Sequence, residues 1–224
     1  MLKGIAEYVD ININIDLYKN IFLCVLENQK IKKHWSDDSK VNEFGKTQFQ
    51  SFSLEGNYSG KPTEYIKDFK PILDEQYKVH PYMQKRSTGF NYSNSNEKDL
   101  FIHTDIDLDT KHPKYFNLVI PIFGTAVISY YETIEDEVWL PEKNAHGYAY
   151  YHEFKKRNDS DYEEFKAKRK FGEIIADKPL LLETNTMHGV DILESPRLAW
   201  VSRWNNIPEH YDFYSWKDRV EKIL

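Results

Sequence analysis

The chain has 224 residues, and its 30 Lys and Arg against 36 Asp and Glu give a formal net charge of −6. This charge argues mildly against broad non-specific binding to nucleic acid or anionic membranes, although a local basic groove remains compatible with it. Cys24 is the single cysteine, which excludes an internal disulfide and favours a reducing, cytoplasmic setting.

The N-terminal part of the chain predicts helices and one strand. Its first residues contain no long apolar run, so we expect neither a secretory signal nor a membrane-spanning segment. Asp16–Asn28 predicts an amphipathic helix with Asp16 as N-cap, and Thr47–Leu54 predicts a strand. Thr63–Tyr77 has apolar residues at helical spacing, and Pro71 inside it should kink or break that helix.

From Tyr82 onward the chain predicts mainly strands. We expect turns at Gly124 and at Ser195-Pro196, and a C-terminal helix over Asp212–Leu224. Because helices do not alternate with strands, the pattern favours a mainly β fold with flanking helices, a jelly-roll or cupin-like barrel. The predicted strands are Met83–Tyr92, Leu100–Ile106, Tyr115–Ile122, Thr125–Tyr131, Pro179–Thr184, His188–Ile192 and Arg197–Trp204.

Glu132–Lys178 is a densely charged segment between two groups of strands. It contains a predicted exposed helix, Ser160–Phe171, in which Ser160 and Glu163 have the spacing of a capping box. Two interpretations stay open: an insertion lying over the barrel mouth, which would help form a substrate pocket, or a solvated surface excursion. The aromatic residues that could line such a pocket are Trp139, Tyr148 and Tyr150.

His103 and Asp105 are two residues apart in a predicted strand, so their side chains leave the same face. With His188 from a distant strand, they form a set of two histidines and one carboxylate. This set suits non-haem Fe(II), because the opposite positions stay open for a co-substrate and dioxygen. The alternative for His103 and Asp105 is a solvated loop, since Asp107 and Asp109 follow closely.

Arg197 lies nine residues after His188, at the start of the last predicted strand. A guanidinium near an iron site can bind the far carboxylate of a dicarboxylate through paired hydrogen bonds. The alternative is a surface residue at a strand end. Together with the three candidate ligands, Arg197 favours the functional interpretation.

Three sequence motifs resemble the signature of the Fe(II)/2-oxoglutarate-dependent oxygenases. They are His103-Thr-Asp105, Thr184-Asn-Thr-Met-His188-Gly-Val and Pro196-Arg197, and Asn117-Leu-Val-Ile-Pro121 resembles the strand after the His-x-Asp of several hydroxylase branches. The resemblance covers about Arg86 to Trp204. It implies a double-stranded β-helix that uses Fe(II), 2-oxoglutarate and dioxygen. The chemistry it implies is oxidative decarboxylation of 2-oxoglutarate to succinate, coupled to oxidation of a substrate C–H bond, usually hydroxylation.

The resemblance also implies roles for individual residues. His103, Asp105 and His188 would bind iron, and Arg197 would bind the distal carboxylate of 2-oxoglutarate. Asn117 is a candidate polar contact in the pocket, with capping of its own backbone as the alternative. The other residue to place is Arg203, which shares a strand face with Arg197 and could reach the co-substrate or an anionic substrate.

The length of 224 residues fits one domain with insertions, so we expect a single oxygenase domain over residues 1–224. Residues 1–81 would support a catalytic core at 82–204, which carries the insertion 132–178, and residues 205–224 would form a closing helix. The expected substrate is a small molecule, an amino acid or a protein side chain.

Two alternatives to this hydroxylase remain. One is an oxygenase that oxidises or demethylates nucleobases, because two arginines six residues apart, Arg197 and Arg203, are a feature of that branch. Ala199 and Val201 between them lack its polar residues, and nucleic acid is therefore the less favoured partner. The other alternative is a non-catalytic cupin-like barrel that binds a metal or ligand. No sequence feature indicates a membrane partner, and the oligomeric state stays open.

Overall fold

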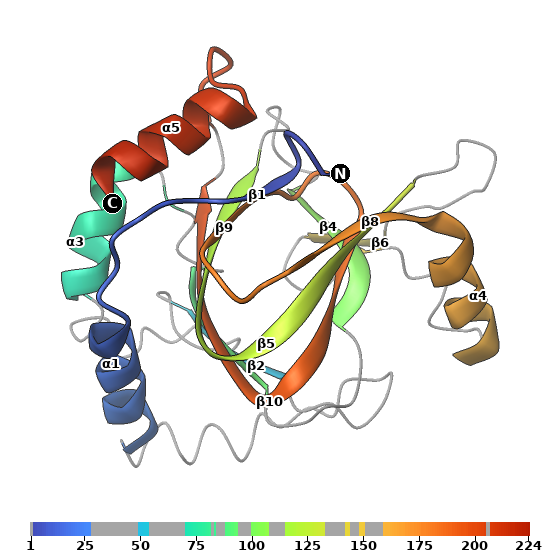
Figure 1. Cartoon of the computed structure of the whole chain (residues 1–224), viewed down its shortest axis with the longest axis horizontal. Coiled ribbons are helices and arrows are strands. Elements are labelled where there is room, and N and C mark those ends of the chain that lie inside the picture. Colours follow the sequence, from blue (N-terminus) through green and yellow to red (C-terminus); the bar gives the residue numbers. More distant parts are fainter. Residues whose placement is uncertain are drawn as a thin grey trace.

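The computed structural model describes residues 2–27, 49–53, 70–81, 83, 88–93, 100–107, 115–132, 142–143, 148–150, 159–204 and 207–224. Ten strands in this part of the chain join one sheet, and all their pairings are antiparallel (Figure 1). The strands are β1 (Ala6–Tyr8), β2 (Phe49–Ser53), β3 (Gly89–Ser93), β4 (Leu100–Asp107), β5 (Phe116–Tyr131), β6 (Glu142–Lys143), β7 (Tyr148–Tyr150), β8 (Lys170–Ile175), β9 (Leu180–Glu183) and β10 (His188–Trp204). The helices are α1 (Ile15–Glu27), α3 (Lys70–Val79), α4 (Asp159–Arg169) and α5 (Phe213–Ile223).

The two long strands β5 and β10 pair along nearly their whole lengths and belong to two layers. In one half they are flanked by β3 and β9, which gives the order β3-β10-β5-β9. In the other half they are flanked by β4 and β8, which gives the order β4-β10-β5-β8. β2 and β1 widen the first of these layers, and β7 and β6 widen the second. Two layers that share two long strands form a double-stranded β-helix, so the predicted fold class is confirmed.

The prediction of chain-reversing turns at Gly124 and at Ser195-Pro196 is wrong. The chain does not reverse there: β5 and β10 run through these positions, and their pairing is irregular only between Ile192 and Ala199. Gly124 has φ 68°, and Ser195-Pro196 is a cis peptide bond. The local turn chemistry therefore bends a continuous pair of strands from one layer into the other, as bulges do in barrels.

Gly124→Ala is expected to destabilise the fold strongly. A Cβ at Gly124 would lie 2.4 Å from the Pro196 carbonyl oxygen and 2.7 Å from that of Glu194, and backbone atoms cannot move aside cheaply. We expect a loss of about 3 kcal/mol or more in the free energy of unfolding. Gly4→Ala is the matched control, since Gly4 has φ 72° but its nearest neighbour, Tyr214, would be 3.8 Å away.

Gly4→Ala should lose only about 1–2 kcal/mol of stability, because alanine, unlike glycine, is disfavoured in the left-handed backbone conformation. Urea denaturation of the two variants and the wild type measures both losses. Equal losses for Gly124→Ala and Gly4→Ala would show that the close approach of the two strands at the bend contributes nothing.

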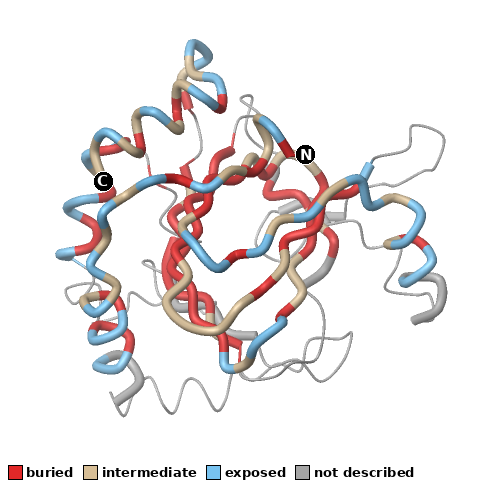
Figure 2. The backbone as a smooth tube through the Cα atoms, in the orientation of Figure 1, coloured by how far each residue is buried: buried red, intermediate tan, exposed pale blue. Residues whose placement is uncertain are grey.

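The main hydrophobic core lies between the β3-β10-β5-β9 layer and the helices α1, α3 and α5 (Figure 1). Trp200 and Trp204 of β10 point into it and are fully buried. Ala199 and Val201 alternate with them and belong to a second cluster, which includes residues of both layers and fills the barrel interior. The buried strands at the centre and the exposed outer faces of the helices are visible in Figure 2.

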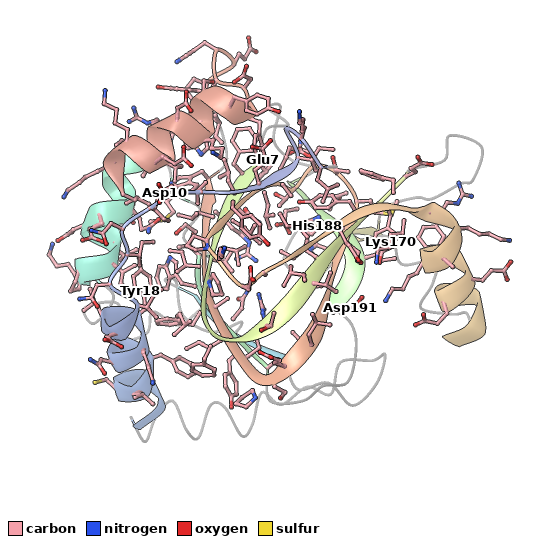
Figure 3. The ribbon with its side chains drawn as sticks, viewed as in Figure 1. Glu7, Asp10, Tyr18, Lys170, His188 and Asp191 are labelled. Atoms are coloured by element: carbon pink, nitrogen blue, oxygen red, sulfur yellow. The ribbon has the colours of Figure 1, made fainter. Side chains whose placement is uncertain are left out.

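A buried polar chain attaches the helices to this layer. Tyr18 points from α1 toward the sheet (Figure 3), and its hydroxyl accepts a hydrogen bond from the Gln76 amide at 3.3 Å. Gln76 in turn accepts from the Ser202 hydroxyl at 2.7 Å, and Ser202 accepts from the Trp200 indole at 2.8 Å. This series of hydrogen bonds gives each of the four polar side chains a partner in an otherwise apolar interface.

The flanking helices form near the predicted places, with one correction at the start of α1. Asn14, and not Asp16, caps α1, because the Leu17 amide donates to the Asn14 side chain at 3.2 Å. Pro71 lies in the first turn of α3, where a missing N–H costs nothing, because this helix begins at Lys70. The predicted residues before α3 lie outside the described ones. The C-terminal helix is confirmed, with a capping box at Asp212.

The segment Glu132–Lys178 is only partly an insertion. Its last strand, β8, pairs with β5 and is the edge of the β4-β10-β5-β8 layer, and β7 pairs with β4. The predicted helix ends at Arg169, because the chain continues from there as β8. Trp139 and the side chains of Ser160, Tyr148 and Tyr150 lie outside what the structure describes. Among the described helices, none is long and apolar enough to cross a membrane.

Candidate metal centre

Pairing between strands brings the three candidate ligands together. His103 and Asp105 project from one face of β4, and His188 is the first residue of β10. His188 pairs directly with His103 on one side and with Tyr130 of β5 on the other. The backbone of Tyr150 pairs with His103 from β7, so one row of residues crosses four strands at this point.

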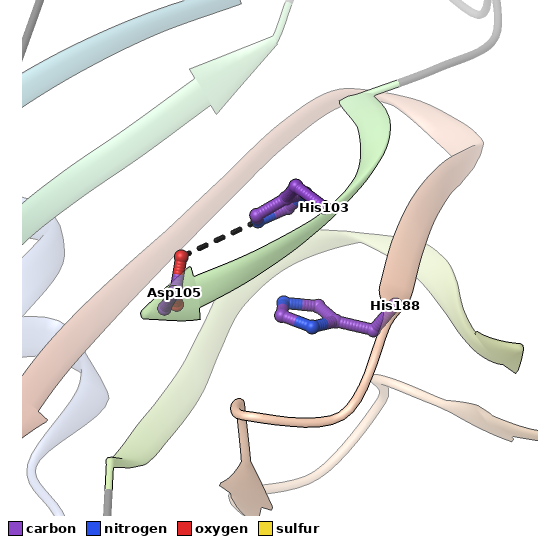
Figure 4. Close-up of side chains that lie close together, drawn as sticks. All are labelled: His103, Asp105 and His188. Carbon is purple, nitrogen blue, oxygen red and sulfur yellow. Dashed lines mark ion pairs between the residues drawn. The ribbon is translucent and has the colours of Figure 1, made fainter. Parts of the chain in front are cut away.

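The ligand atoms of His103, Asp105 and His188 all lie within 4.8 Å of one another (Figure 4). His103 Nε2 is 3.4 Å from Asp105 Oδ1, and the centroids of the two imidazole rings are 4.3 Å apart. Asp105 and His188 are buried, and His103 is partly buried. Two imidazoles and one carboxylate at this separation can coordinate a single metal ion from one side.

The hydrogen bond of His188 selects the ring nitrogen that is free for a metal. Its Nδ1 lies 2.9 Å from the Thr186 carbonyl oxygen, which can only accept, so Nδ1 carries the proton. The lone pair is then on Nε2. Burial, reinforced by the neighbouring His103, lowers the pKa of His188 to about 4, so the ring is neutral near pH 7. A neutral imidazole oriented by a carbonyl is the usual form of a metal ligand.

Two side chains hold the second oxygen of the Asp105 carboxylate. The Asn117 amide donates to Oδ2 at 2.6 Å, and Arg203 Nε lies 3.7 Å from the same atom. Burial alone would raise the pKa of the Asp105 carboxyl, but the hydrogen bond from His103 and the charges of His103 and Arg203 hold it well below its usual range. Asp105 is therefore an anion, and its Oδ1 faces His103, where a metal would bind.

These contacts place Asn117 and Arg203 beside a candidate ligand. Of the two interpretations of Asn117, the structure has the side chain contacting Asp105 and not its own backbone. Asn117 and Arg203 also face each other as a pair across β5 and β10. This pairing could not be predicted from the sequence, because it depends on the register of two strands distant in the chain.

Arg197 is a buried cation with an unsatisfied donor. Its side chain is 4% exposed, and its Nε has no hydrogen-bond partner among the described residues. Burial lowers its pKa to about 10, so the guanidinium still carries its charge near pH 7. Alternation along β10 places it on the inward face with Ala199 and Val201. A buried charge is costly without a counter-charge, so the position is suited to an anionic ligand.

The residues therefore fit an Fe(II) ion and a dicarboxylate. The donor set has the right composition, Nε2 of His188 is free, and Oδ1 of Asp105 is not occupied by Asn117.

Two further residues near the candidate metal centre were not predicted from the sequence. Tyr130 is fully buried, with its ring centroid 5.9 Å from that of His188, and Glu183 accepts hydrogen bonds from the turn before His188. The polar run Glu-Thr-Asn-Thr after a predicted strand is a turn signal that could have identified Glu183.

The metal-free protein should lose stability as the pH falls from about 6.5 to 4. The folded pKa of His188, about 4, is below its value of about 6.5 in an unfolded chain, so the unfolded state takes up a proton first. The contribution of His188 is thus complete above pH 6.5 and is lost as the pH falls, by at most about 3 kcal/mol. His80, whose pKa burial also lowers, contributes in the same direction.

Chemical denaturation of the metal-free wild type and of His188→Gln across this range measures the effect. The variant should show a clearly smaller pH slope. Identical slopes would mean that the imidazole of His188 is not held neutral in the folded protein.

Comparison with known proteins found similarity in structure but not in sequence. No family model and no curated protein matches the sequence. A prolyl-4-hydroxylase from Pseudomonas putida is structurally similar, with a TM-score of 0.41 and 10% identity over 89% of this chain and 90% of that chain. E. coli ycfD has a TM-score of 0.36 and 10% identity over 76% of this chain and 37% of that chain. At such TM-scores we base no functional conclusion on either protein.

Proposed function

We propose that this protein is an Fe(II)- and 2-oxoglutarate-dependent oxygenase that oxidises a C–H bond, in most cases to an alcohol. One observation carries the proposal: His103, Asp105 and His188 converge inside a double-stranded β-helix that also buries Arg197 on its inward face, with no partner for its Nε among the described residues. The three ligands account for a metal, and the arginine accounts for an anionic co-substrate. A metal that served only structure would not need the arginine.

The residues of the chain would perform separate tasks in this reaction. Bound Fe(II) would supply the activation of dioxygen that couples decarboxylation of 2-oxoglutarate to substrate oxidation. Arg197 would bind the distal carboxylate of 2-oxoglutarate through a forked, charge-assisted hydrogen bond. Asn117 and Arg203 would hold Asp105 by Oδ2 and leave Oδ1 for the metal. The apolar interior around Ala199 and Val201 would keep bulk water from the reacting groups.

Succinate formation tests this proposal. Purified protein is incubated with Fe(II), ascorbate, 2-oxoglutarate and air, alone and with pools of amino acids, peptides, small metabolites and nucleotides. We expect slow succinate release without substrate and faster release with one pool. His210→Ala, which changes an exposed histidine, should behave as the wild type. If no pool and no uncoupled reaction gives succinate above the level of a His188→Ala variant, the proposed activity is wrong.

A nucleobase-oxidising oxygenase is the second candidate. The observation that favours it is the place of Arg203, which lies inside the barrel beside Asp105 and shares a strand face with Arg197. Methylated nucleosides and single-stranded oligonucleotides are therefore included among the pools. Stimulation by these alone would favour this candidate over a hydroxylase of amino acids or small molecules.

A further inference from the structure

The turn between β9 and β10 is organised around one carboxylate, that of Glu183. Its Oε1 accepts the Asn185 amide at 2.9 Å. Its Oε2 accepts both the Thr186 amide at 3.1 Å and the Thr186 hydroxyl at 2.6 Å. Three donors from Asn185 and Thr186 converge on this half-buried side chain and fix the backbone of these two residues, whose amides have no strand partner of their own.

The same turn contacts two of the three candidate metal ligands. The Thr184 carbonyl accepts the backbone amide of Asp105 at 2.9 Å. Two residues later, the Thr186 carbonyl accepts Nδ1 of His188 at 2.9 Å. One bond fixes the strand that carries the carboxylate, and the other fixes the tautomer and rotation of the imidazole.

The turn is also anchored to the barrel from its other side. The Asn185 side chain accepts the Tyr115 amide at 2.9 Å, and the Thr184 amide donates to the Tyr115 carbonyl at 3.1 Å. These bonds hold the turn as a whole but do not set the direction of the Thr186 carbonyl. Thr186 itself is held by its two hydrogen bonds to Glu183, and the Tyr131 amide holds the next residue through the Met187 carbonyl at 2.9 Å.

We propose that Glu183 is a positioning residue of the metal centre, which acts through the Thr186 carbonyl to hold His188 with its Nε2 free for the metal. The proposal rests on the proposed function only for the identity of the metal. Loss of the carboxylate leaves the amides of Asn185 and Thr186 without their acceptor, so the turn can rotate. The Thr186 carbonyl then no longer fixes Nδ1, and His188 can adopt the other tautomer or another ring orientation.

Three variants separate this role from a general effect on stability. Glu183→Gln keeps the shape but replaces one acceptor oxygen with a donor that faces amide donors. Thr186→Val removes only the hydroxyl bond and is the milder change, usable if the first variant folds poorly. Glu221→Gln is the matched control, because Glu221 also accepts a backbone amide, that of Asp10 at 2.9 Å, but lies on α5.

The first measurement needs no metal. Nitrogen-15 shifts of labelled histidine report which ring nitrogen of His188 carries the proton, with assignment by a His188→Gln sample. In the metal-free wild type and in Glu221→Gln, His188 should be the Nδ1–H tautomer. In Glu183→Gln it should be a mixture of tautomers. Retention of a pure Nδ1–H form in both Glu183→Gln and Thr186→Val overturns the proposal.

The second measurement is titration with Co(II), followed by its visible absorption. We expect Co(II) to bind Glu183→Gln about 10- to 100-fold more weakly than the wild type, as for other residues that orient metal ligands, and Thr186→Val a few-fold more weakly. Glu221→Gln should bind as the wild type. Equal affinities for all three variants contradict the proposal. If the wild type itself binds no Co(II) or Fe(II), the proposed function fails, and the tautomer measurement still decides the role of Glu183.

Discussion

Replacing His103 or Asp105 with alanine is expected to abolish Fe(II)-dependent oxidation of 2-oxoglutarate while the protein stays folded. Each change leaves two of the three ligands that lie within 4.8 Å of one another. Loss of a residue that only orients a ligand costs about 10- to 100-fold in metal affinity, so loss of a ligand should cost more than about 100-fold. Other residues form the main core, which lies between the β3-β10-β5-β9 layer and the helices, so these substitutions leave it intact.

Fe(II) affinity is measured under nitrogen, and folding is checked by circular dichroism and thermal unfolding. His210→Ala serves as the control for metal held by surface histidines, because His210 is exposed. A His103→Ala or Asp105→Ala variant that keeps the affinity and turnover of the wild type would show that the metal binds elsewhere.

Arg197→Leu is expected to weaken 2-oxoglutarate binding and, in the absence of ligands, to leave the fold as stable as before or more stable. A forked contact between a guanidinium and a carboxylate contributes about 1.5–3 kcal/mol, so its loss should reduce affinity about tenfold or more. Without the ligand, Arg197 is a buried charge whose Nε has no described partner, and an apolar side chain removes that cost. A substitution that weakens ligand binding but does not destabilise the ligand-free fold indicates that the residue serves ligand binding and not stability.

Arg197→Lys and Arg203→Leu are the informative comparisons. A lysine ammonium cannot donate two parallel hydrogen bonds in one plane, so Arg197→Lys should recover only part of the affinity. Arg203 contacts Asp105 and is expected to affect the metal more than 2-oxoglutarate. Isothermal titration with 2-oxoglutarate gives the affinities, and urea denaturation gives the stabilities. A greater loss of 2-oxoglutarate affinity in Arg203→Leu would reverse the two assignments and favour the nucleobase-oxidising candidate.

The parts of the site that follow from local spacing could be predicted from the sequence. His103 and Asp105 share a face because they are two residues apart in a strand, and His188 could be added from its motif. The contacts of Asn117 and Arg203 with Asp105 could not be predicted with the same clarity. They depend on the register between β5 and β10, which no local pattern specifies.

The fold shows the same division between local and distant information. The apolar runs on either side of Gly124 predicted two strands, because a glycine between such runs usually marks a turn. The structure has one strand, since β10 pairs with both halves and its own bend faces Gly124. Lys170–Ile175 was assigned in part to a helix and in full to an insertion, although it forms β8. Its pairing with β5 outweighs the helical pattern of the charged residues before it.

The most direct test of a metal and 2-oxoglutarate meeting at this site is an anaerobic absorption measurement. 2-Oxoglutarate is titrated into Fe(II)-loaded wild-type protein, and the visible metal-to-ligand band that a chelated 2-oxo acid produces is followed. We predict a saturable band in the wild type, no band in Asp105→Ala, and a band that needs at least about tenfold more 2-oxoglutarate in Arg197→Leu. A wild-type protein that binds Fe(II) but develops no band, or a band unchanged in both variants, would contradict the proposed oxygenase site.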